Sequence, residues 1–455
     1  MLLSRVFEPF VQQRPIAVMA RGILERLFEP QAIDRLFART AERQYTRKLL
    51  FSSLVELLGQ VVLGVQPSVL AAYQALAEHI PVSDQAVYDK LQRVELAVST
   101  ALVAESAQRA APVIRHLKTA HPAWVPGFQT KILDGNHLAA TEHRLAELRT
   151  TWAAPLPGKA LVVLDQASML VTHVRLHEDG QAQERSLLDE VLPLVQPREL
   201  WLADRNFCTL KFLFGIVAAA GAFCIRQHGT LVGELLGKPK AKGRCATGAV
   251  SEQKLRLRYE GRVLVVRRVT VVLDQPTTDG DREIHVLTNL TQRQANPAQV
   301  AELYRKRWTI EGLFLEVTQT LTCEIKTLAY PPAALLAFCL ALLASNAVAV
   351  LKAALRAAHG AEAVERLSGY YLMLEVRQTY DGMMIAIPAK HWVVFRQLSD
   401  AQLARVLREL AGQVKLARYR KHSRGPKKKP PRRSRYRNGE HVATAKILVA
   451  RQQRK

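Results

Sequence analysis

The stretches Lys131-Ile132-Leu133-Asp134 and Leu200-Trp201-Leu202-Ala203-Asp204 decide the fold expected for this chain of 455 residues. Each is a short apolar run of the kind that forms a buried β-strand, and each ends in an aspartate. A third acid, Glu311, lies in a later segment with helical spacing. Carboxylates at two strand ends and on a later helix can converge, and such a set can hold two divalent ions.

The segments around the two aspartates predict a ribonuclease-H-like α/β core. The expected elements are a strand, a short helix, two strands, a helix closed by Pro193 and a strand, at 128–133, 138–149, 160–164, 170–176, 185–192 and 200–203. Without the first helix, the order is strand, strand, strand, helix, strand. Neighbouring central strands of such a core place two carboxylates side by side.

A β-strand insertion is expected to interrupt this core at residues 221–296. Strand-like runs occur at 222–226, 255–259, 263–273 and 282–287, with turns predicted at Gly237-Lys238-Pro239, Glu260-Gly261 and Pro276–Gly280. Helices then follow at 297–308, at 309–324 and from Ala333 onward. The core is therefore predicted in two parts, 126–220 and 297–360, and the second part carries Glu311.

Residues 1–125 have helical spacing and predict an N-terminal helical domain that binds DNA. Ser83 is a suitable N-cap for a helix that would expose Gln85, Lys90 and Arg93. This helix could be the second of a helix-turn-helix pair. An ordinary surface helix of an all-α domain is the alternative.

Charge is the strongest signal in the composition, since 64 Lys and Arg face 40 Asp and Glu, for a net charge of +24. Such an excess is typical of proteins that bind a polyanion. In the C-terminal region, 361–455, residues 361–412 predict helix and strand. Residues 415–437 hold 12 Lys and Arg and no acid. We interpret 415–437 as a basic arm that follows DNA phosphates.

One segment, 333–351, is apolar enough to resemble a membrane span, but its Ala content and polar Ser345 and Asn346 favour a buried core helix. No amphipathic anchor or signal peptide is evident, so we expect no membrane partner and a cytoplasmic location. The five scattered cysteines indicate a reducing compartment without disulfides.

The chemistry is concentrated in Tyr304-x-x-Arg307-x-x-x-Glu311, which on a single helix would share one face. Arg307 can bind a phosphate through two parallel hydrogen bonds, Tyr304 can donate to a backbone oxygen, and Glu311 can complete a metal site. A solvated face of salt bridges is the alternative for these residues taken alone.

Together with Asp134-Gly135-Asn136-His137 and Asp204-Arg205-Asn206-Phe207, this motif resembles the bacterial DDE-class transposases of the insertion sequence four family. Members carry a Tyr-x2-Arg-x3-Glu-x6-Lys signature and a β-strand insertion between the second and third acids. The resemblance spans about residues 40–350.

The resemblance implies cut-and-paste transposition through a hairpin intermediate. Asp134, Asp204 and Glu311 would hold two Mg²⁺ ions, for which Mn²⁺ can substitute. The partners would be double-stranded DNA, as terminal inverted repeats and as target, and a second copy of the chain, since two ends are cut together. Such a protein would work at the nucleoid.

Two features depart from the family pattern. Thr318 stands where the signature Lys belongs, so Lys306 or Lys326, the latter expected further along the same helix, would have to supply the charge. Relatives hold a flipped base with a Trp of the insertion, but residues 221–296 contain none, and Tyr259 is the one Tyr there.

Several further residues are candidates for DNA contact or metal binding. Arg226 and His228 follow the strand after Asp204 and could meet DNA, although Arg226 could equally form a structural ion pair. Arg205 could contact DNA or support Asp204. Asp165 competes with Asp134 as a carboxylate but is expected in a strand-to-strand turn. His137 and His143 do not make a convincing zinc site.

Two other functions remain open on these residues. A transposase that has lost catalysis and only binds DNA would keep the charge and the N-terminal helices, and Thr318 favours it. The second is a structure-selective nuclease on the same fold. The Tyr-Arg-Glu signature and the β-insertion favour a transposase over such a nuclease.

Overall fold

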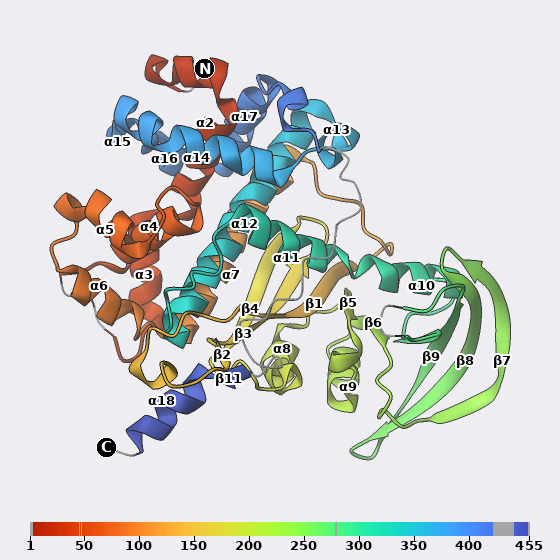
Figure 1. Cartoon of the computed structure of the whole chain (residues 1–455). Helices are drawn as coiled ribbons and strands as arrows, with labels where there is room; N and C mark the ends of the chain where they lie inside the picture. The colour runs from red at the N-terminus through yellow and green to blue at the C-terminus, as the bar shows by residue number, and fades with distance from the viewer. Residues whose placement is uncertain (1–2, 45, 47, 278–279, 422–440, 454–455) are drawn as a thin grey trace.

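The computed structural model describes residues 3–44, 46, 48–277, 280–421 and 441–453 (Figure 1). A mixed sheet of nine strands crosses the molecule in the order β4-β3-β1-β5-β6-β10-β9-β8-β7. Figure 1 shows helices from both ends of the chain gathered on one side of this sheet, and the long strands β7, β8 and β9 at the other end.

The predicted ribonuclease-H-like core is confirmed at the β4 end of the sheet. Its strands are β1 (Gln129–His137), β3 (Lys159–Asp165), β4 (Leu170–His177), β5 (Glu199–Ala203) and β6 (Ala222–Arg226). Strand β1 pairs antiparallel with β3 and parallel with β5, so it is central. One expectation was wrong: β1 continues to His137, so Asp134 lies within the strand, opposite Val162, and not at its end.

The helix predicted at 138–149 is absent, and the one helical turn in that segment is the 3-10 turn η3 (Ala146–Leu148). Its backbone is used for tertiary hydrogen bonds instead. The amide of Thr141 donates to the carbonyl of Pro155 at 3.0 Å, and that of Glu142 donates to the carbonyl of Lys326 at 2.8 Å. Pro155 belongs to β2 (Ala154–Leu156), which pairs with β11 (His441–Ala443).

The helix predicted at 185–192 is a run of three short helical pieces: η4 (Glu184–Leu187), α8 (Leu188–Val191) and η5 (Leu192–Leu194). Pro193 falls in the last of them, and the chain then turns into β5. Helix α9 (Leu210–Ala218) follows β5 and packs on the same face of the sheet, in the cluster that buries Trp201 and Phe212.

The insertion strands continue the core sheet. They are β7 (Glu234–Cys245), β8 (Gly248–Tyr259), β9 (Arg262–Leu273) and β10 (Glu283–Thr288), and β10 pairs antiparallel with β6. Strand β7 was not expected, because Gly237-Lys238-Pro239 predicts a turn. These residues lie within β7 where its register with β8 slips, and β7 is an edge strand, on which proline is tolerated.

The helices of residues 3–117 and 361–412 share one core around α12 (Pro331–His359). No strand occurs within 361–412, so the mixed prediction there was wrong. The remaining helices are α1 (Glu8–Gln13), α2 (Pro15–Leu27), α3 (Pro30–Thr40), α4 (Phe51–Val62), α5 (Val69–Ala75), α6 (Asp84–Leu91), α7 (Leu96–Leu117), α10 (Pro297–Lys306), α11 (Thr309–Thr320), α13 (Ala361–Glu365), α14 (Gly369–Ala386), α15 (Ala389–Trp392), α16 (Val394–Gln397), α17 (Asp400–Gly412) and α18 (Thr444–Gln452). Short 3-10 turns are η1 (Arg5–Phe7), η2 (Ala77–His79), η6 (Arg205–Phe207) and η7 (Leu416–Tyr419).

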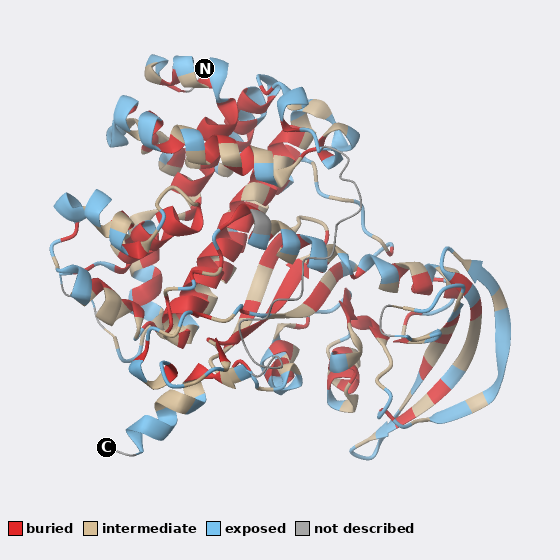
Figure 2. Ribbon diagram, viewed as in Figure 1, coloured by how far each residue is buried: buried red, intermediate tan, exposed pale blue. Residues whose placement is uncertain are grey.

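Helix α12 is the apolar segment that could be mistaken for a membrane span. It is long and apolar enough to cross a bilayer, but 89% of its most apolar window is buried inside the protein. Figure 2 shows it as a buried rod enclosed by the other helices, and its contacts include α7, α17, α2 and β4. The prediction of a buried core helix is therefore confirmed.

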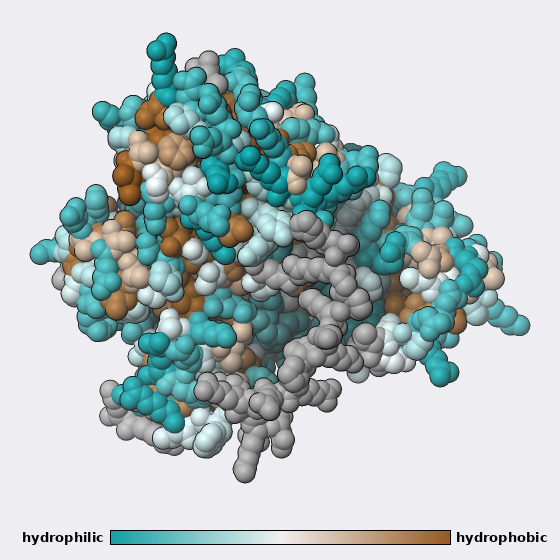
Figure 3. Space-filling view, turned by 45° about the horizontal axis from the view of Figure 1, so that its top comes forward, coloured by the Kyte–Doolittle hydropathy of each residue, from teal (hydrophilic) through white to brown (hydrophobic). Residues whose placement is uncertain are grey.

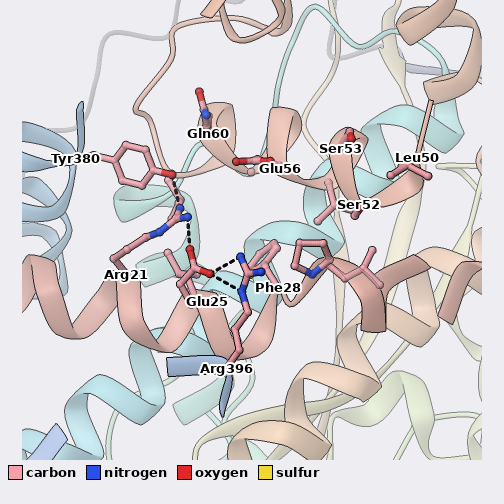
Figure 4. Close-up of a pocket in the computed structure, with 16 residues that line it drawn as sticks. Arg21, Glu25, Phe28, Leu50, Ser52, Ser53, Glu56, Gln60, Tyr380 and Arg396 are labelled. Atoms are coloured by element: carbon pink, nitrogen blue, oxygen red, sulfur yellow. Dashed lines mark hydrogen bonds and ion pairs between the residues drawn. The ribbon is translucent and has the colours of Figure 1, made fainter. Parts of the chain in front are cut away.

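A buried ion network joins the N-terminal helices to the C-terminal ones (Figure 4). Glu25 of α2 is 4% exposed and binds two guanidinium groups, those of Arg21 and Arg396. Arg21 also donates to the Tyr380 hydroxyl of α14 at 2.5 Å. The network borders a cavity of about 270 Å³.

The candidate DNA-reading helix α6 begins as predicted, because the Ser83 hydroxyl accepts from the Ala86 amide at 3.3 Å. Gln85 and Arg93 are exposed, but Lys90 is turned inward. Its Nζ donates to the Leu49 carbonyl at 3.1 Å and lies 4.9 Å from the centre of the Phe37 ring. The DNA-reading role of α6 stays a prediction, and Lys90 is no longer among the side chains expected to contact DNA.

Most of the predicted basic arm, residues 422–440 with their three prolines, lies outside the described residues. Its first part, 415–421, is held on the protein. Tyr419 of η7 is buried, and its hydroxyl is hydrogen-bonded to the Glu375 carboxylate of α14.

Asn346 is the polar residue on which the packing of α12 against the sheet depends. It is fully buried; its Oδ1 accepts from the Val171 amide of β4 at 2.8 Å, and its Nδ2 donates to the Val171 carbonyl at 3.0 Å. Asn346→Leu leaves both backbone groups without partners, so we expect a loss of roughly 3 kcal/mol in the free energy of unfolding. Urea unfolding measures it, with Ser345→Ala on the same helix as the control. Equal stability of the wild type and Asn346→Leu would contradict this account.

Candidate active site

The Tyr-Arg-Glu motif spans a break between two helices and does not lie on one helix face as predicted. Helix α10 ends at Lys306, α11 begins at Thr309, and Arg307 and Trp308 form the joint. Helix α10 packs on β6 to β10, whereas α11 packs on β1, α12 and α14. The chain bends here because the two helices follow different surfaces.

Arg307 brings the motif together at this joint. Its side chain is 9% exposed; Nη1 donates to Oδ2 of Asp134 at 2.8 Å, and Nη2 donates to Oε1 of Glu311 at 2.7 Å. The Tyr304 ring centre lies 6.0 Å from the guanidinium carbon. Three of the predicted site residues therefore surround Arg307.

Asp204 belongs to the same cluster. It follows β5, which is the parallel neighbour of β1, and its carboxylate caps η6 by accepting from the Asn206 amide. The charge of Asp204 raises the pKa of both Asp134 and Arg307, so the three acids and the guanidinium share one electrostatic site.

The pKa of Asp134 is raised to about 6. Burial is the largest cause, and the charges of Asp204 and Glu311 add to it, while Arg307 and a hydrogen bond from the Gly135 amide oppose it. The Arg307 guanidinium has a raised pKa because its acidic neighbours outweigh its burial. The site thus holds more negative charge than Arg307 alone compensates.

Asp134, Asp204 and Glu311 are hard oxygen donors of the type that Mg²⁺ and Mn²⁺ prefer. Within the described part of the chain, no three His, Cys, Asp or Glu side chains are close enough to share one ion, because Arg307 bridges Asp134 and Glu311. The uncompensated charge at Asp134 nevertheless suits a divalent cation.

Sequence reasoning missed Glu184, which contacts the residues just after both aspartates. Its carboxylate lies 3.3 Å from Nε2 of His137, and hydrogen bonds with His137 and Asn206 and the charge of Lys159 lower its pKa. A side chain at Gly135 would require the Glu184 carboxylate to move. Gly135 and Asn206, which both lie near Glu184, were the available sequence signal for this contact. No local pattern marks Glu184 itself.

Trp308 was also missed. It is 62% exposed, although it adjoins the buried Arg307, and with Tyr304 it lines an apolar cavity of about 400 Å³ beneath β9 and β10. Tyr259, the one Tyr of the insertion, packs against Phe214 of α9.

Other predicted DNA contacts have partners within the protein. Arg226 lies 2.6 Å from Asp281, and Arg205 lies 3.7 Å from the same carboxylate. Of the two alternatives for Arg226, the structure therefore has the ion pair. Nδ1 of His228 lies 2.7 Å from the Thr230 hydroxyl.

The candidates for the missing signature Lys also look different in the structure. Lys326 is exposed but follows the end of α11 at Thr320, so it is not on that helix as expected. Thr318 is exposed, and its hydroxyl donates to the Phe314 carbonyl at 2.9 Å. Nζ of Lys306 lies 5.2 Å from the Trp124 ring centre. Asp165, the rival acid, is paired with Lys131 at 3.0 Å.

The sheet around this site is consistent with the ribonuclease-H-like core of a DDE transposase. Residues 129–347 match the protein family described as "Transposase DDE domain", so this part of the chain is a DDE domain and the chain is a DDE-class transposase. No match was found among curated proteins. The family implies a strand-cleaving enzyme that acts on DNA.

The raised pKa of Asp134 predicts a pH-dependent cost to the metal-free fold. Above pH 6 the folded chain must ionise a buried carboxyl, whereas the unfolded chain ionises it from its ordinary pKa of 3.8 upward. Asp134→Asn should therefore raise the free energy of unfolding at pH 7.5 by roughly 2–3 kcal/mol, at 1.36 kcal/mol per pKa unit.

That gain should shrink as the pH falls from 6 through 3.8, because the carboxyl is then protonated in both states. Urea titrations with a chelator present, for the wild type and Asp134→Asn, measure the difference. A gain that does not change across this window would show that the Asp134 charge is not the cause.

Proposed function

We propose that this chain moves an insertion sequence by cut-and-paste transposition. The observation that carries the proposal is the ion-paired cluster of Asp134, Arg307 and Glu311, with Asp204 on the neighbouring strand, inside the matched domain. The Tyr-Arg-Glu spacing and the β-insertion favour the insertion sequence four group.

Asp134, Asp204 and Glu311 would hold two Mg²⁺ ions, and Mn²⁺ could replace them. When bound, such ions activate water and stabilise charge on a phosphodiester. Arg307 is held by the carboxylates in the metal-free site, and its fork geometry also fits a phosphate. Its guanidinium would turn to the phosphodiester, while Tyr304 beside it would donate to a backbone oxygen.

A hairpin intermediate requires a tight turn of DNA at the cut end and a place for an unstacked base. Trp308 offers an exposed indole next to Arg307, and the apolar cavity that it lines with Tyr304 has about 400 Å³ of room. Stacking on an aromatic ring needs no particular base. We therefore assign base capture to Trp308, which lies outside the insertion.

The DNA partners would be the terminal inverted repeats and the target duplex, held by a homodimer at the nucleoid. Hydrophilic side chains cover most of the face in Figure 3, including the outer strands. Lys238 and Lys240, both exposed, and the half-buried Lys242 lie on β7 and add positive charge to the insertion. Lysines on an edge strand also prevent pairing with other sheets, so they support DNA binding only together with the site.

Excision from a plasmid that carries the gene's own flanking terminal repeats tests the function. Asp134→Asn should lower excision by about three orders of magnitude, equivalent to about 4 kcal/mol of transition-state stabilisation, because one metal-binding carboxylate is lost. Asp189→Asn is the matched control, since this acid is 63% exposed on α8 and pairs with Lys211.

Excision that needs Asp134 and a divalent metal supports transposition. End binding in a salt-dependent shift assay without excision by the wild type would instead support a catalytically inactive DNA-binding transposase, for which Thr318 is the motivating residue. Cleavage of junctions without preference for the terminal repeats would support a structure-selective nuclease.

Trp308→Ala should reduce hairpin formation by about ten- to a hundredfold, because stacking of one base contributes about 1–3 kcal/mol. First-strand nicking should persist, and Trp308→Phe should restore much of the hairpin. Gel analysis of end-labelled DNA separates the nicked and hairpin products. Trp152→Ala, at an indole that is 79% exposed and distant in sequence, is the control. Equal loss of nicking and hairpin in Trp308→Ala would rule out base capture.

A further inference from the structure

A cavity of about 250 Å³ lies between α11, α12 and α13, away from the catalytic acids, and a basic residue at its wall has no acid partner. This residue is Arg356, in the last turn of α12. Its Nε and Nη2 are closed to solvent and make no hydrogen bond within the described chain. Nor does any described carboxylate lie within ion-pair distance of it.

The contrast with the cavity of Figure 4 is informative. There Glu25 binds both Arg21 and Arg396, so each guanidinium group has an acid partner inside the protein. At Arg356 burial lowers the guanidinium pKa and no acid offsets it, and the charge also lowers the pKa of the neighbouring His121. A buried charge without a partner is costly, so such a site is suited to an anion from outside.

Two lysines also line this cavity. Lys352 pairs with Glu316 through distances of 2.5 and 2.8 Å. Lys421 is exposed, and its Nζ donates to the backbone carbonyl of Glu365 at 3.1 Å, which leaves its charge uncompensated by that bond. The lining acids are Glu316, which Lys352 occupies, and the exposed Glu365.

The cavity is continuous with the catalytic helix. A neighbouring cavity of about 470 Å³ shares Glu316, Lys352, Leu367 and Lys421 with it and reaches Gly312, the residue after Glu311. Gly312 has open space where a side chain would be. The two cavities together form a groove along α11 from Gly312, the residue after Glu311, to Arg356.

We propose that this groove binds the sugar-phosphate backbone of a DNA strand that leaves the active site, with one phosphate bound by Arg356 and Lys421. The proposal rests on the proposed function for the identity of the strand. Phosphate is the chemistry that fits a guanidinium with unused donors, and the continuity with Glu311 favours DNA over a free ion.

The test compares the salt dependence of binding to a terminal-repeat duplex for the wild type, Arg356→Gln, Lys421→Gln and Arg405→Gln. Each lost phosphate contact lowers the slope of log affinity against log salt by about 0.9. We expect this decrease, with about tenfold weaker binding at low salt, for Arg356→Gln and Lys421→Gln. Arg405, on α17 and 62% exposed, should give the wild-type slope.

Thermal unfolding of the DNA-free variants provides a second measurement. Arg356→Gln removes a desolvated charge, so its melting temperature should equal or exceed that of the wild type. A melting temperature that falls, with an unchanged slope for Lys421→Gln, would show that Arg356 supports the fold and would overturn the proposal.

A wild-type slope in both variants would also overturn the proposal. If, in addition, inorganic phosphate competed with DNA in the wild type but not in Arg356→Gln, the cavity would be a site for a small anion. Binding does not require cleavage, so a wild type that binds with the expected slopes but never excises would count against transposition alone.

Discussion

The buried guanidinium of Arg307 is the interaction on which the candidate active site depends. It links Asp134 on the central strand to Glu311 on α11, at 2.8 and 2.7 Å, and so fixes a helix to a sheet through two of the candidate metal-binding acids. Burial of the Asp134 carboxyl raises its pKa, and the charge of Arg307 opposes that rise. Arg307 therefore offsets part of the cost of burying Asp134 while it links the helix to the sheet.

The helix break follows from this contact. Arg307 must point inward to reach Asp134, and the next residue along a tight turn then points elsewhere, which leaves Trp308 exposed between two buried neighbours, Arg307 and Ile310. An uninterrupted helix would keep α10 on the insertion strands or α11 on β1, but not both. The bend thus places a cationic group and an aromatic group side by side, one directed to the acids and the other to the cavity beneath β9 and β10.

The core strands and the convergence of the three acids could be predicted from sequence because each signal is local. Apolar runs ending in Asp134 and Asp204 needed only pattern, and their pairing followed from the order of elements. The failures arose where tertiary contacts override local preference. Residues 138–149 have helical spacing, yet their amides bond to Pro155 and Lys326. Strand β7 contains a glycine and a proline that predict a turn, but an edge strand tolerates them. Glu184 has no local signal, since its role depends on its contacts with His137 and Asn206, which come from separate segments.

The basic charge of the chain shows the same limit of sequence reasoning. A net charge of +24 indicates a polyanion partner but does not say which cations meet it. Arg226 and Arg205 were reasonable candidates by position, yet both share Asp281, so binding a phosphate would require them to leave a partner. Arg356 had no motif to recommend it, yet its Nε and Nη2 have no bonding partner among the described residues. A cation already neutralised by the fold gains little from DNA, whereas one that the fold leaves unpaired gains both Coulomb energy and hydrogen bonds. A basic residue is therefore a candidate for DNA contact when the fold leaves its charge without an acid partner. Its distance in sequence from the three acids matters less.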